Sequence, residues 1–494
     1  MLDDAAFSGS WPTGLDPATN TTGGGNLTQM SAIYGGLFRL EANADGSNAK
    51  VVPYQAASGD YAPDGKSITI KLKPNIKFSD GTPFDADAVV FNIRRDMNAD
   101  CTCKPTWQLD GTPEQAITAQ GSDTVVIKFA QPTATAIAAF VIANVNWIGS
   151  PTAIQAMGDQ FAIKPVAAGP FTVESDDLSQ KLVLKKNPTF FIEGRPYLDT
   201  LIVQSIQGDQ PAYQALLAGQ AQAYEGMTTI PLLEEAKNNS SLVVTQQPAT
   251  SPYVIQLNTK IPPFNDIHAR EAIYYATNVE AIRTGLFKGA YPASQSFTAP
   301  GGLFNHSTIP GYRTYDLQKA TDIINQYYGG SLNVDLGTLD AYVANQVDTE
   351  LQTEWAQAGI HAKLHSDQLG ALVQNFIGGK WQAMLQTAGA WDPAVGVGVG
   401  FRFGTTSPFS GISDTQIDDL LQQAGQISDP ARRDALYLQV GQRISDQAYA
   451  PFILAFAPAS VVTKGVHGPG LDTLIPPVVV NTAILWSDAW MEQS

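Results

Sequence analysis

Length, composition and charge exclude several classes of protein. The chain has 494 residues, too many for one ordinary core, and 44% of them are hydrophobic while only 15% are charged, which excludes a disordered chain. The formal net charge of -17 repels nucleic acid and anionic membranes, although the same charge also serves solubility. No apolar run is long enough to span a bilayer, and residues 1–4 lack the basic and apolar regions of a signal peptide, as a chain without its leader also would.

The N-terminal part of the chain predicts a loop followed by strands and a helix. Residues 20–26 have the Gly, Thr and Asn content of a loop, and the apolar run around Ile33 predicts a short helix that leads into a strand. Apolar alternation over residues 68–72 predicts a half-buried strand. Asp85 is placed to cap a helix that ends at Met97.

The rest of the chain alternates between the two kinds of element. Further strands are predicted at residues 125–129, 182–184, 360–364 and 452–456, and helices at 211–217, 269–277, 317–326, 340–358, 415–424 and 431–446. Mixed elements with short loops indicate an α/β protein. Because the chain is long enough for several domains but shows no repeat and no flexible linker, we expect it to cross between lobes more than once.

Two cysteines, Cys101 and Cys103, are separated by one residue. Two thiols are too few for a structural zinc site, and a bridge over one residue closes a very small, strained loop. A local disulfide and two free thiols both remain open.

Enzyme and metal signatures are absent. There is no G-x-S-x-G elbow, Walker loop or dinucleotide fingerprint, and the glycine-rich residues 396–400 lack the spacing and the following helix of a phosphate cradle. His361 and His365 have the i, i+4 spacing of a helical metal pair. However, residues 360–364 alternate like a strand, along which four residues span about 13 Å, too far for one metal. We therefore predict no catalytic residues, no metal and no cofactor.

The best candidate for recognition is a loop near residue 390. Residues 387–393 and 401–403 combine Trp391, Asp392, Phe401 and Arg402, and so two aromatic faces, a carboxylate and a guanidinium in a glycine-rich setting. Such loops bind ligands when a rigid scaffold holds them. The alternative is that the aromatic rings fill a core.

A series of motifs, in order along the whole chain, resembles the peptide/nickel/opine class of ABC-importer solute-binding proteins, family 5. The most specific is the run IKFSDGTPFDADAV at residues 76–89, preceded by YGGL at 34–37. Further matches lie at residues 168–171, 184–191, 257–264, 270–273, 351–360 and 391–393.

This resemblance implies a periplasmic-binding-protein-like α/β fold, in which two lobes close on a ligand at a hinge and a third domain is inserted in the first lobe. Mapped onto this chain, the first lobe holds residues 1–42, 165–248 and 468–494, the inserted domain 43–164, and the second lobe 249–467. The implied activity is ligand capture by hinge closure and delivery to a membrane permease.

The resemblance also suggests ligand-binding positions. Peptide-binding relatives hold the ligand's ammonium group with an aspartate before Asp-Pro, a place that falls here at Gly389 or Ala390, with Asp392 as a neighbouring substitute. Dipeptide-binding relatives hold the carboxylate with an arginine, where this chain has neutral Asn345 and Gln346. The full set of expected ligand-binding residues is Thr21, Tyr34, Tyr342, Asn345, Gln346, Gly389, Ala390, Trp391, Asp392, Phe401 and Arg402.

We therefore expect a non-enzymatic binding protein for an oligopeptide or peptide-like solute. An oligosaccharide, an opine or a metal chelate is the alternative ligand, because neutral amides beside aromatic rings also suit uncharged solutes. A hydrolase and a structural or adhesion module are alternatives from other classes. The resemblance implies a monomer that works with separate permease subunits, periplasmic or lipid-anchored outside the cell membrane, without a nucleic-acid partner.

Overall fold

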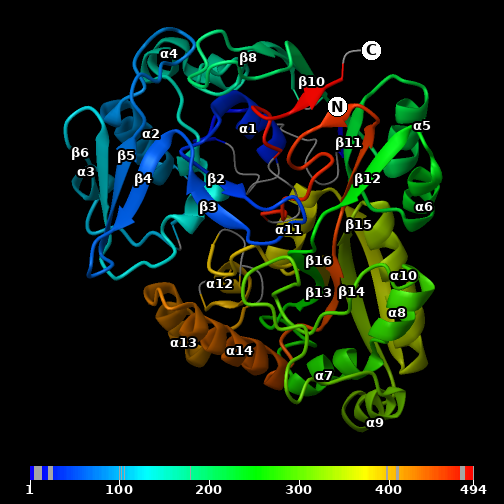
Figure 1. Ribbon diagram of the computed structural model, residues 1–494. Coiled ribbons are helices and arrows are strands. Elements are labelled where there is room, and N and C mark those ends of the chain that lie inside the picture. The colour runs from blue at the N-terminus through cyan, green and yellow to red at the C-terminus, as the bar shows by residue number, and fades with distance from the viewer. Residues whose placement is uncertain are drawn as a thin grey trace.

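The computed structural model describes residues 1–4, 14–19, 26–99, 101, 103–104, 106–178, 180–395, 399–405, 407, 411–478 and 484–492. Within these ranges the side chains of Tyr342, Leu369, Val399, Phe401 and Phe456 are not described. The described part is the expected α/β fold, with two large sheets and a smaller third sheet (Figure 1).

The first lobe is built on a seven-stranded mixed sheet. Its strands in spatial order are β12 (Leu242–Gln246), β18 (Ala459–Thr463), β11 (Ala223–Met227), β1 (Leu2–Asp4), β10 (Thr200–Ile206), β9 (Lys181–Lys186) and β8 (Phe171–Asp177). Buried and exposed residues alternate along β9 and β10, so one face of that part of the sheet is turned to the core. The helices of this lobe are α1 (Leu27–Tyr34), α5 (Asp209–Leu217) and α6 (Ile230–Asn238).

The second lobe has a five-stranded sheet with helices around it. Its strands in spatial order are β15 (Ile360–Asp367), β14 (Leu332–Leu339), β16 (Ala383–Thr387), β13 (Ser251–Leu257) and β17 (Phe452–Phe456). Its helices are α7 (Ile267–Ala276), α8 (Val279–Gly285), α9 (Leu317–Tyr328), α10 (Tyr342–Gln357), α11 (Leu369–Ile377), α12 (Val399–Phe403), α13 (Thr415–Gln426) and α14 (Pro430–Asp446). Strand β14 runs parallel to β15 and β16, so the carboxyl ends of these three strands meet at one edge.

The inserted domain carries a four-stranded antiparallel sheet on one side of the molecule (Figure 1). Its strands in spatial order are β4 (Ala56–Tyr61), β5 (Ser67–Leu72), β7 (Thr124–Lys128) and β6 (Ile117–Ala119), and its helices are α2 (Ala86–Asn98), α3 (Pro113–Ala116) and α4 (Pro151–Met157). Short 3₁₀ turns lie at Ala138–Val141, Asn144–Asn146 and Gly158–Ala162, and the hairpin of β2 (Phe38–Glu41) and β3 (Lys50–Pro53) leads into the domain.

The elements predicted for the inserted domain are confirmed. The Asp85 side chain caps α2 by accepting from the Ala88 amide at 3.0 Å, and β5 falls on the alternating residues 67–72. The helix expected around Ile33 begins earlier, at Leu27, and the following strand is β2. Of the two states left open for the cysteines, the structure has the disulfide Cys101–Cys103.

In the described part of the chain, two crossings join the lobes, one after β12 and one between β17 and β18. The two crossings lie side by side, because the Gln247 amide donates to the Pro458 carbonyl at 3.1 Å. Since β18 pairs with β11 and β12, the second crossing precedes the boundary drawn at residue 467. Strands β17 and β18 are both apolar and only two residues apart, so the sequence did not indicate that they belong to different sheets. The other domain boundaries remain predictions.

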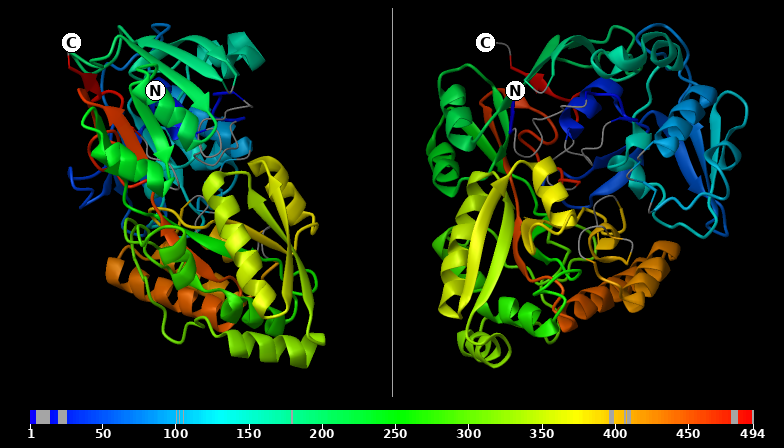
Figure 2. Two further views of the ribbon diagram at one scale, coloured as in Figure 1. Left: turned by 90° about the vertical axis from the view of Figure 1, so that its right-hand side faces the viewer. Right: turned by 180° about the vertical axis from the view of Figure 1, so that it is seen from behind.

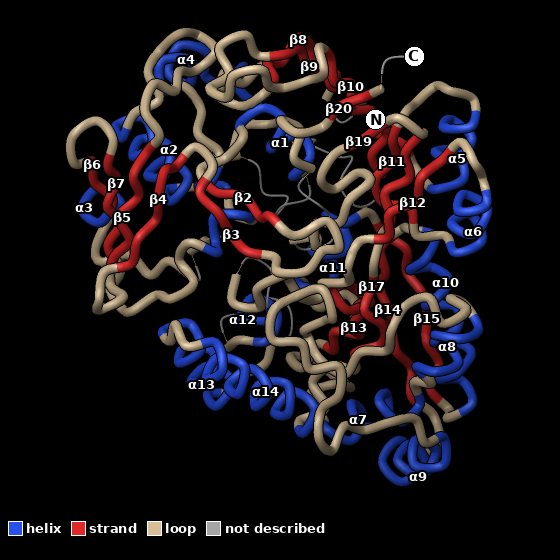
Figure 3. Tube along the Cα trace, in the orientation of Figure 1, coloured by secondary structure: helices blue, strands red, loops and turns tan. Residues whose placement is uncertain are grey.

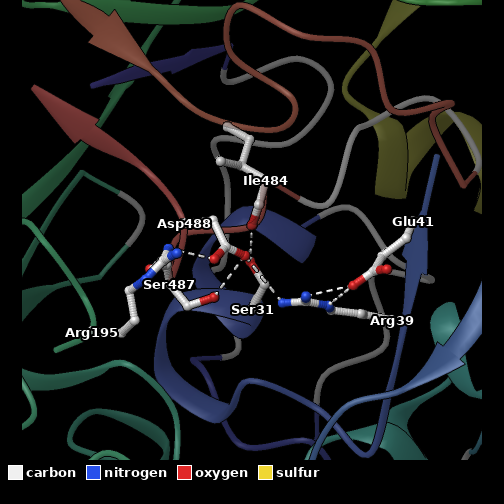
Figure 4. Close-up of polar contacts among 7 residues, drawn as sticks. All are labelled: Ser31, Arg39, Glu41, Arg195, Ile484, Ser487 and Asp488. Atoms are coloured by element: carbon white, nitrogen blue, oxygen red, sulfur yellow. Dashed lines mark hydrogen bonds and ion pairs between the residues drawn. The ribbon is translucent and has the colours of Figure 1, made fainter. Parts of the chain in front are cut away.

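The C-terminal segment is fixed to the first lobe by a polar cluster around Asp488 (Figure 4). The Asp488 carboxylate pairs with Arg39 of β2 at 3.3 Å and with Arg195 at 2.5 Å. Ser31 of α1 donates to the Ile484 carbonyl at 3.1 Å, and Arg39 also pairs with Glu41 at 2.5 Å. A short strand pair, β19 (Val466–His467) with β20 (Trp490–Met491), completes this end. Among the described residues, no helix is both long and apolar enough to cross a membrane.

Candidate functional site

The candidate site lies where the loop after β16 reaches from the second lobe toward the first. The parallel pairing of β14 and β16 brings the start of α10 and this loop to the same edge of the sheet. Helix α12 follows the loop and lies centrally among the three parts of the molecule, as the two views of Figure 2 and the trace in Figure 3 agree. The sequence-predicted residues of the second lobe therefore come from three neighbouring segments.

The base of the loop has a fixed shape. Gly389 has a φ of +147°, and a Cβ atom there would stand 2.7 Å from the Phe297 carbonyl oxygen and 3.0 Å from Cδ of Pro252. The Ser251 hydroxyl donates to the Gly389 carbonyl at 3.1 Å, and the Ala388 amide donates to the Pro252 carbonyl at 2.9 Å. A side chain at position 389 would therefore be strained and would clash with backbone atoms, so glycine fits best here.

Trp391 joins the two lobes. Its amide donates to the carbonyl of Val478 in the first lobe at 2.8 Å, and its carbonyl accepts from the Leu303 amide at 2.7 Å. The ring is 5% exposed and packs with the core of the first lobe and the inserted domain, and Ala390 beside it is also buried. In this structure the loop is therefore held by both lobes.

Asp392 has a protein partner. Its carboxylate accepts hydrogen bonds from Arg433 of α14 at 3.0 and 3.2 Å and from the Ala394 backbone amide at 3.0 Å. Both side chains of the Asp392–Arg433 pair are buried. The Arg433 guanidinium also lies 4.7 Å from the centre of the Phe304 ring. An ammonium group at Asp392 would therefore have to share the carboxylate with an arginine.

A row of polar side chains runs from α12 into the sheet. The Arg402 guanidinium donates to the Gln386 side-chain oxygen, and the Gln386 amide donates to Oε1 of Gln256 at 3.3 Å. Burial lowers the pKa of Arg402 to about 9. The Nε2 atom of Gln256 is buried and has no hydrogen-bond partner among the described residues. The neighbouring Phe401 contributes its backbone to α12, and its side chain is outside the described part.

The start of α10 brings Tyr342, Asn345 and Gln346 together. The Asn345 amide donates to Asp340 at 3.4 Å, and its side-chain oxygen accepts from the Ser366 hydroxyl at 3.2 Å. Gln346 is half-buried, and only the backbone of Tyr342 is described. Asn345 and Gln346 are neutral hydrogen-bonding residues, and the Asp340 carboxylate lies beside Asn345.

Tyr34, the described first-lobe residue of the predicted set, lies elsewhere. Tyr34 is fully buried in α1, where its hydroxyl donates to the Leu15 carbonyl at 2.9 Å, and burial raises its pKa well above the usual range. Its ring fills the core, and its hydroxyl hydrogen is already donated. Thr21 falls outside the described residues.

The histidine pair is part of a strand, as predicted. His361 and His365 both lie on β15, and His365 pairs with Asp335 at 2.7 Å while its ring stacks on Trp381 at 3.7 Å. In the described part of the chain, no group of three His, Cys, Asp or Glu side chains is arranged to hold a metal. Arg433, Gln386 and Gln256 were not among the predicted residues, because their contacts join distant segments that local patterns do not relate.

Comparison with known proteins decides the family. The profile described as "Bacterial extracellular solute-binding proteins, family 5 Middle" matches residues 50–407. The chain belongs to this family. This family 5 solute-binding protein is 27% identical over 463 residues to the glutathione-binding protein GsiB of Shigella flexneri, covering 87% of this chain and 84% of the relative.

Solved structures share the fold of this solute-binding protein over nearly their whole length. The DppA protein of Helicobacter pylori, in complex with the peptide STSA, has a TM-score of 0.85 and 20% identity, with 100% and 98% of the two chains covered. The protein AgaA of A. tumefaciens R10, in complex with agropinic acid, has a TM-score of 0.83 and 20% identity over 100% and 98% of the chains. These matches confirm the expected fold class, that of the periplasmic binding proteins, with several domains.

Proposed function

We propose that this solute-binding protein captures a peptide or peptide-like solute between its two lobes, without chemical change, and delivers it to separate ABC permease subunits. The observation that carries the proposal is the loop at residues 388–392, which belongs to the second lobe but is hydrogen-bonded to the first through Trp391 and Val478. A ligand that contacts this loop would be sensitive to the relative position of the lobes. Occupancy and closure would therefore be coupled.

The contacts of the loop favour a ligand without an essential free ammonium group. Asp392 is paired with Arg433, and Gly389 has no side chain, so neither offers an uncommitted carboxylate. The proposed contacts are stacking on Trp391, hydrogen bonds from Asn345 and Gln346, and polar contact with Arg402. Backbone groups of Gly389 and Ala390 would form hydrogen bonds with the amide groups of the ligand. Tyr342, Phe401 and Thr21 remain proposed contacts.

An opine-like solute is the second candidate. The neutral groups at Asn345 and Gln346 suit a ligand that lacks the second charge of a dipeptide, and AgaA, a structure of the same fold, holds agropinic acid. The proposed location is the periplasm or, with a lipid anchor, the outer face of the cell membrane, and the proposed state is a monomer.

A thermal-shift screen tests the proposal. The purified protein is scanned against reduced glutathione, the dipeptide Met-Leu, tetrapeptides, agropinic acid, oligosaccharides and nickel–histidine. A ligand at 100 times its dissociation constant stabilises the folded state by about 2.7 kcal/mol, which a melting curve resolves. Peptide-induced shifts with unchanged peptide on recovery support capture. A shift with agropinic acid alone favours the opine, and cleavage of the added peptide contradicts a pure binding role.

A further inference from the structure

The inserted domain contacts the second lobe as well as the first. The Thr106 hydroxyl donates to the Ala394 carbonyl at 3.2 Å, and the Ala134 amide donates to the Gly425 carbonyl at 2.8 Å. Thr106 and Ala134 belong to the inserted domain, whereas Ala394 and Gly425 belong to the second lobe. Figure 1 shows α13 directly below this domain, in agreement with the second contact.

A third group of the inserted domain faces the same region. The Tyr61 hydroxyl donates to the Ala134 carbonyl at 3.0 Å and accepts from the Ile137 amide at 2.9 Å, which fixes the turn that carries Ala134. Burial raises the pKa of Tyr61 to about 12, and the Asp392 carboxylate adds to this effect while Arg433 opposes it. The Tyr61 hydroxyl therefore holds the segment from Ala134 to Ile137 within the inserted domain.

The two hydrogen-bonding points of the inserted domain are linked through Trp107. Trp107, the residue after Thr106, is buried, and its ring nitrogen donates at 3.0 Å to the carbonyl of Ala136, two residues after Ala134. The Trp107 amide donates to the carbonyl of Cys103 at 2.7 Å, and Cys103 forms a disulfide with Cys101. Thr106 and Ala134 are thus held relative to each other by the core of their own domain.

The second-lobe segment that accepts the Thr106 hydrogen bond is the loop of the candidate site. The Ala394 and Val395 amides donate to the side chain and the backbone carbonyl of Asp392, at 3.0 and 3.2 Å. Val395 also packs in the same core as Trp107. The loop from 391 to 395 is therefore bound on one side by the first lobe, through Trp391 and Val478, and on the other by the inserted domain.

We propose that the inserted domain takes part in closure on the ligand, and that Thr106 is a positioning residue that holds the 388–395 loop through Ala394. The inference that Thr106 helps to retain the ligand rests on the proposed function, whereas the hydrogen bond between Thr106 and the loop does not depend on it. On this proposal the Thr106–Ala394, Ala134–Gly425 and Trp391–Val478 hydrogen bonds are specific to the closed state, so that state can be followed at three different segments.

The test compares Thr106→Val, which removes the donor at equal size, with Thr106→Ser, which keeps it. Thr118→Val, on β6 at the outer edge of the inserted sheet, is the matched control. Hydrogen–deuterium exchange at the Ala134 and Trp391 amides is read by mass spectrometry, with and without reduced glutathione or Met-Leu. The valine variant should exchange both amides about two- to tenfold faster, as expected for the loss of one neutral hydrogen bond, while the serine variant and the control match the parent.

Stopped-flow binding gives the second readout. With whichever of the two peptides binds, the valine variant should raise the dissociation rate by a similar factor and leave the association rate unchanged. Equal exchange in Thr106→Val and the parent, at both amides, would overturn the inference. Faster exchange at Ala134 alone would also overturn it, because the loop would then not depend on the inserted domain. If neither peptide binds the parent, the proposed ligand class fails, whereas the exchange result still decides whether Thr106 holds the loop.

Discussion

The buried ion pair Asp392–Arg433 allows a quantitative prediction. Its side chains are 2% and 10% exposed, and the two charges approach to 3.0 Å. Asp392→Asn keeps the size of the side chain and an acceptor for the Ala394 amide, but leaves the guanidinium buried without its counter-charge. Breaking such a pair costs about 3–5 kcal/mol. We expect the lower end of this range, because the Tyr437 hydroxyl at 3.4 Å and the Phe304 ring still contact Arg433.

A double-mutant cycle measures this contribution. Asp392→Asn, Arg433→Met and the double variant are unfolded in urea, with tryptophan fluorescence as the probe. The single variants should each lose about 3 kcal/mol, and the double variant should lose clearly less than their sum, with a coupling energy of about 2 kcal/mol or more. A coupling energy below about 0.5 kcal/mol would refute the assignment of Asp392 as a structural partner. So would a selective loss of affinity for peptides with a free N-terminus, compared with acetylated peptides, at unchanged stability.

Three further predictions follow from single side chains. Gly389→Ala places a Cβ 2.7 Å from the Phe297 carbonyl at a positive φ, so it should lower both stability, by about 1–3 kcal/mol, and ligand affinity, as measured by melting and calorimetry. Trp391→Ala should weaken ligand binding at least tenfold, and an unchanged dissociation constant would remove the ring from the proposed site. Burial raises the pKa of Glu354 to about 7, so the folded state should lose roughly 3 kcal/mol as the pH rises from about 4.5 to 7.5. Glu354→Gln, which preserves an oxygen for the Asn278 amide, should remove most of that slope, and an unaltered pH profile would contradict it.

Periodicity predicted most elements of this chain. The helices α2 and α10 and the strand β15 were predicted near their observed bounds, because their apolar residues repeat at 3.6 or 2 residues over a long enough stretch. The family motifs predicted the fold, whereas the loop at residues 387–393 was selected for its aromatic and charged residues. The short helix α1 contains Ile33 and leads into β2, as predicted, but the sequence did not indicate that it begins as early as Leu27.

The partners within the candidate site could not be predicted in the same way. Asp392 and Arg433 are 41 residues apart, and nothing in either segment indicates that α14 passes the loop. The contact between Thr106 and Ala394 spans 288 residues and two domains. Such contacts depend on how the lobes are packed, so a local pattern identifies a chemically suitable side chain but not the partner that occupies it.

The position of β18 has a consequence for how the chain folds during synthesis. Strand β18 lies between β12 and β11, so β12 has no neighbouring strand until residue 463 has left the ribosome. The second lobe, in contrast, is one continuous stretch from β13 to β17 and can fold as soon as it emerges. The part of the protein that begins first is therefore completed last, and its half-built sheet has an open edge throughout the synthesis of the other lobe. A chain that ends prematurely before β18 would keep that edge, and we expect it to aggregate.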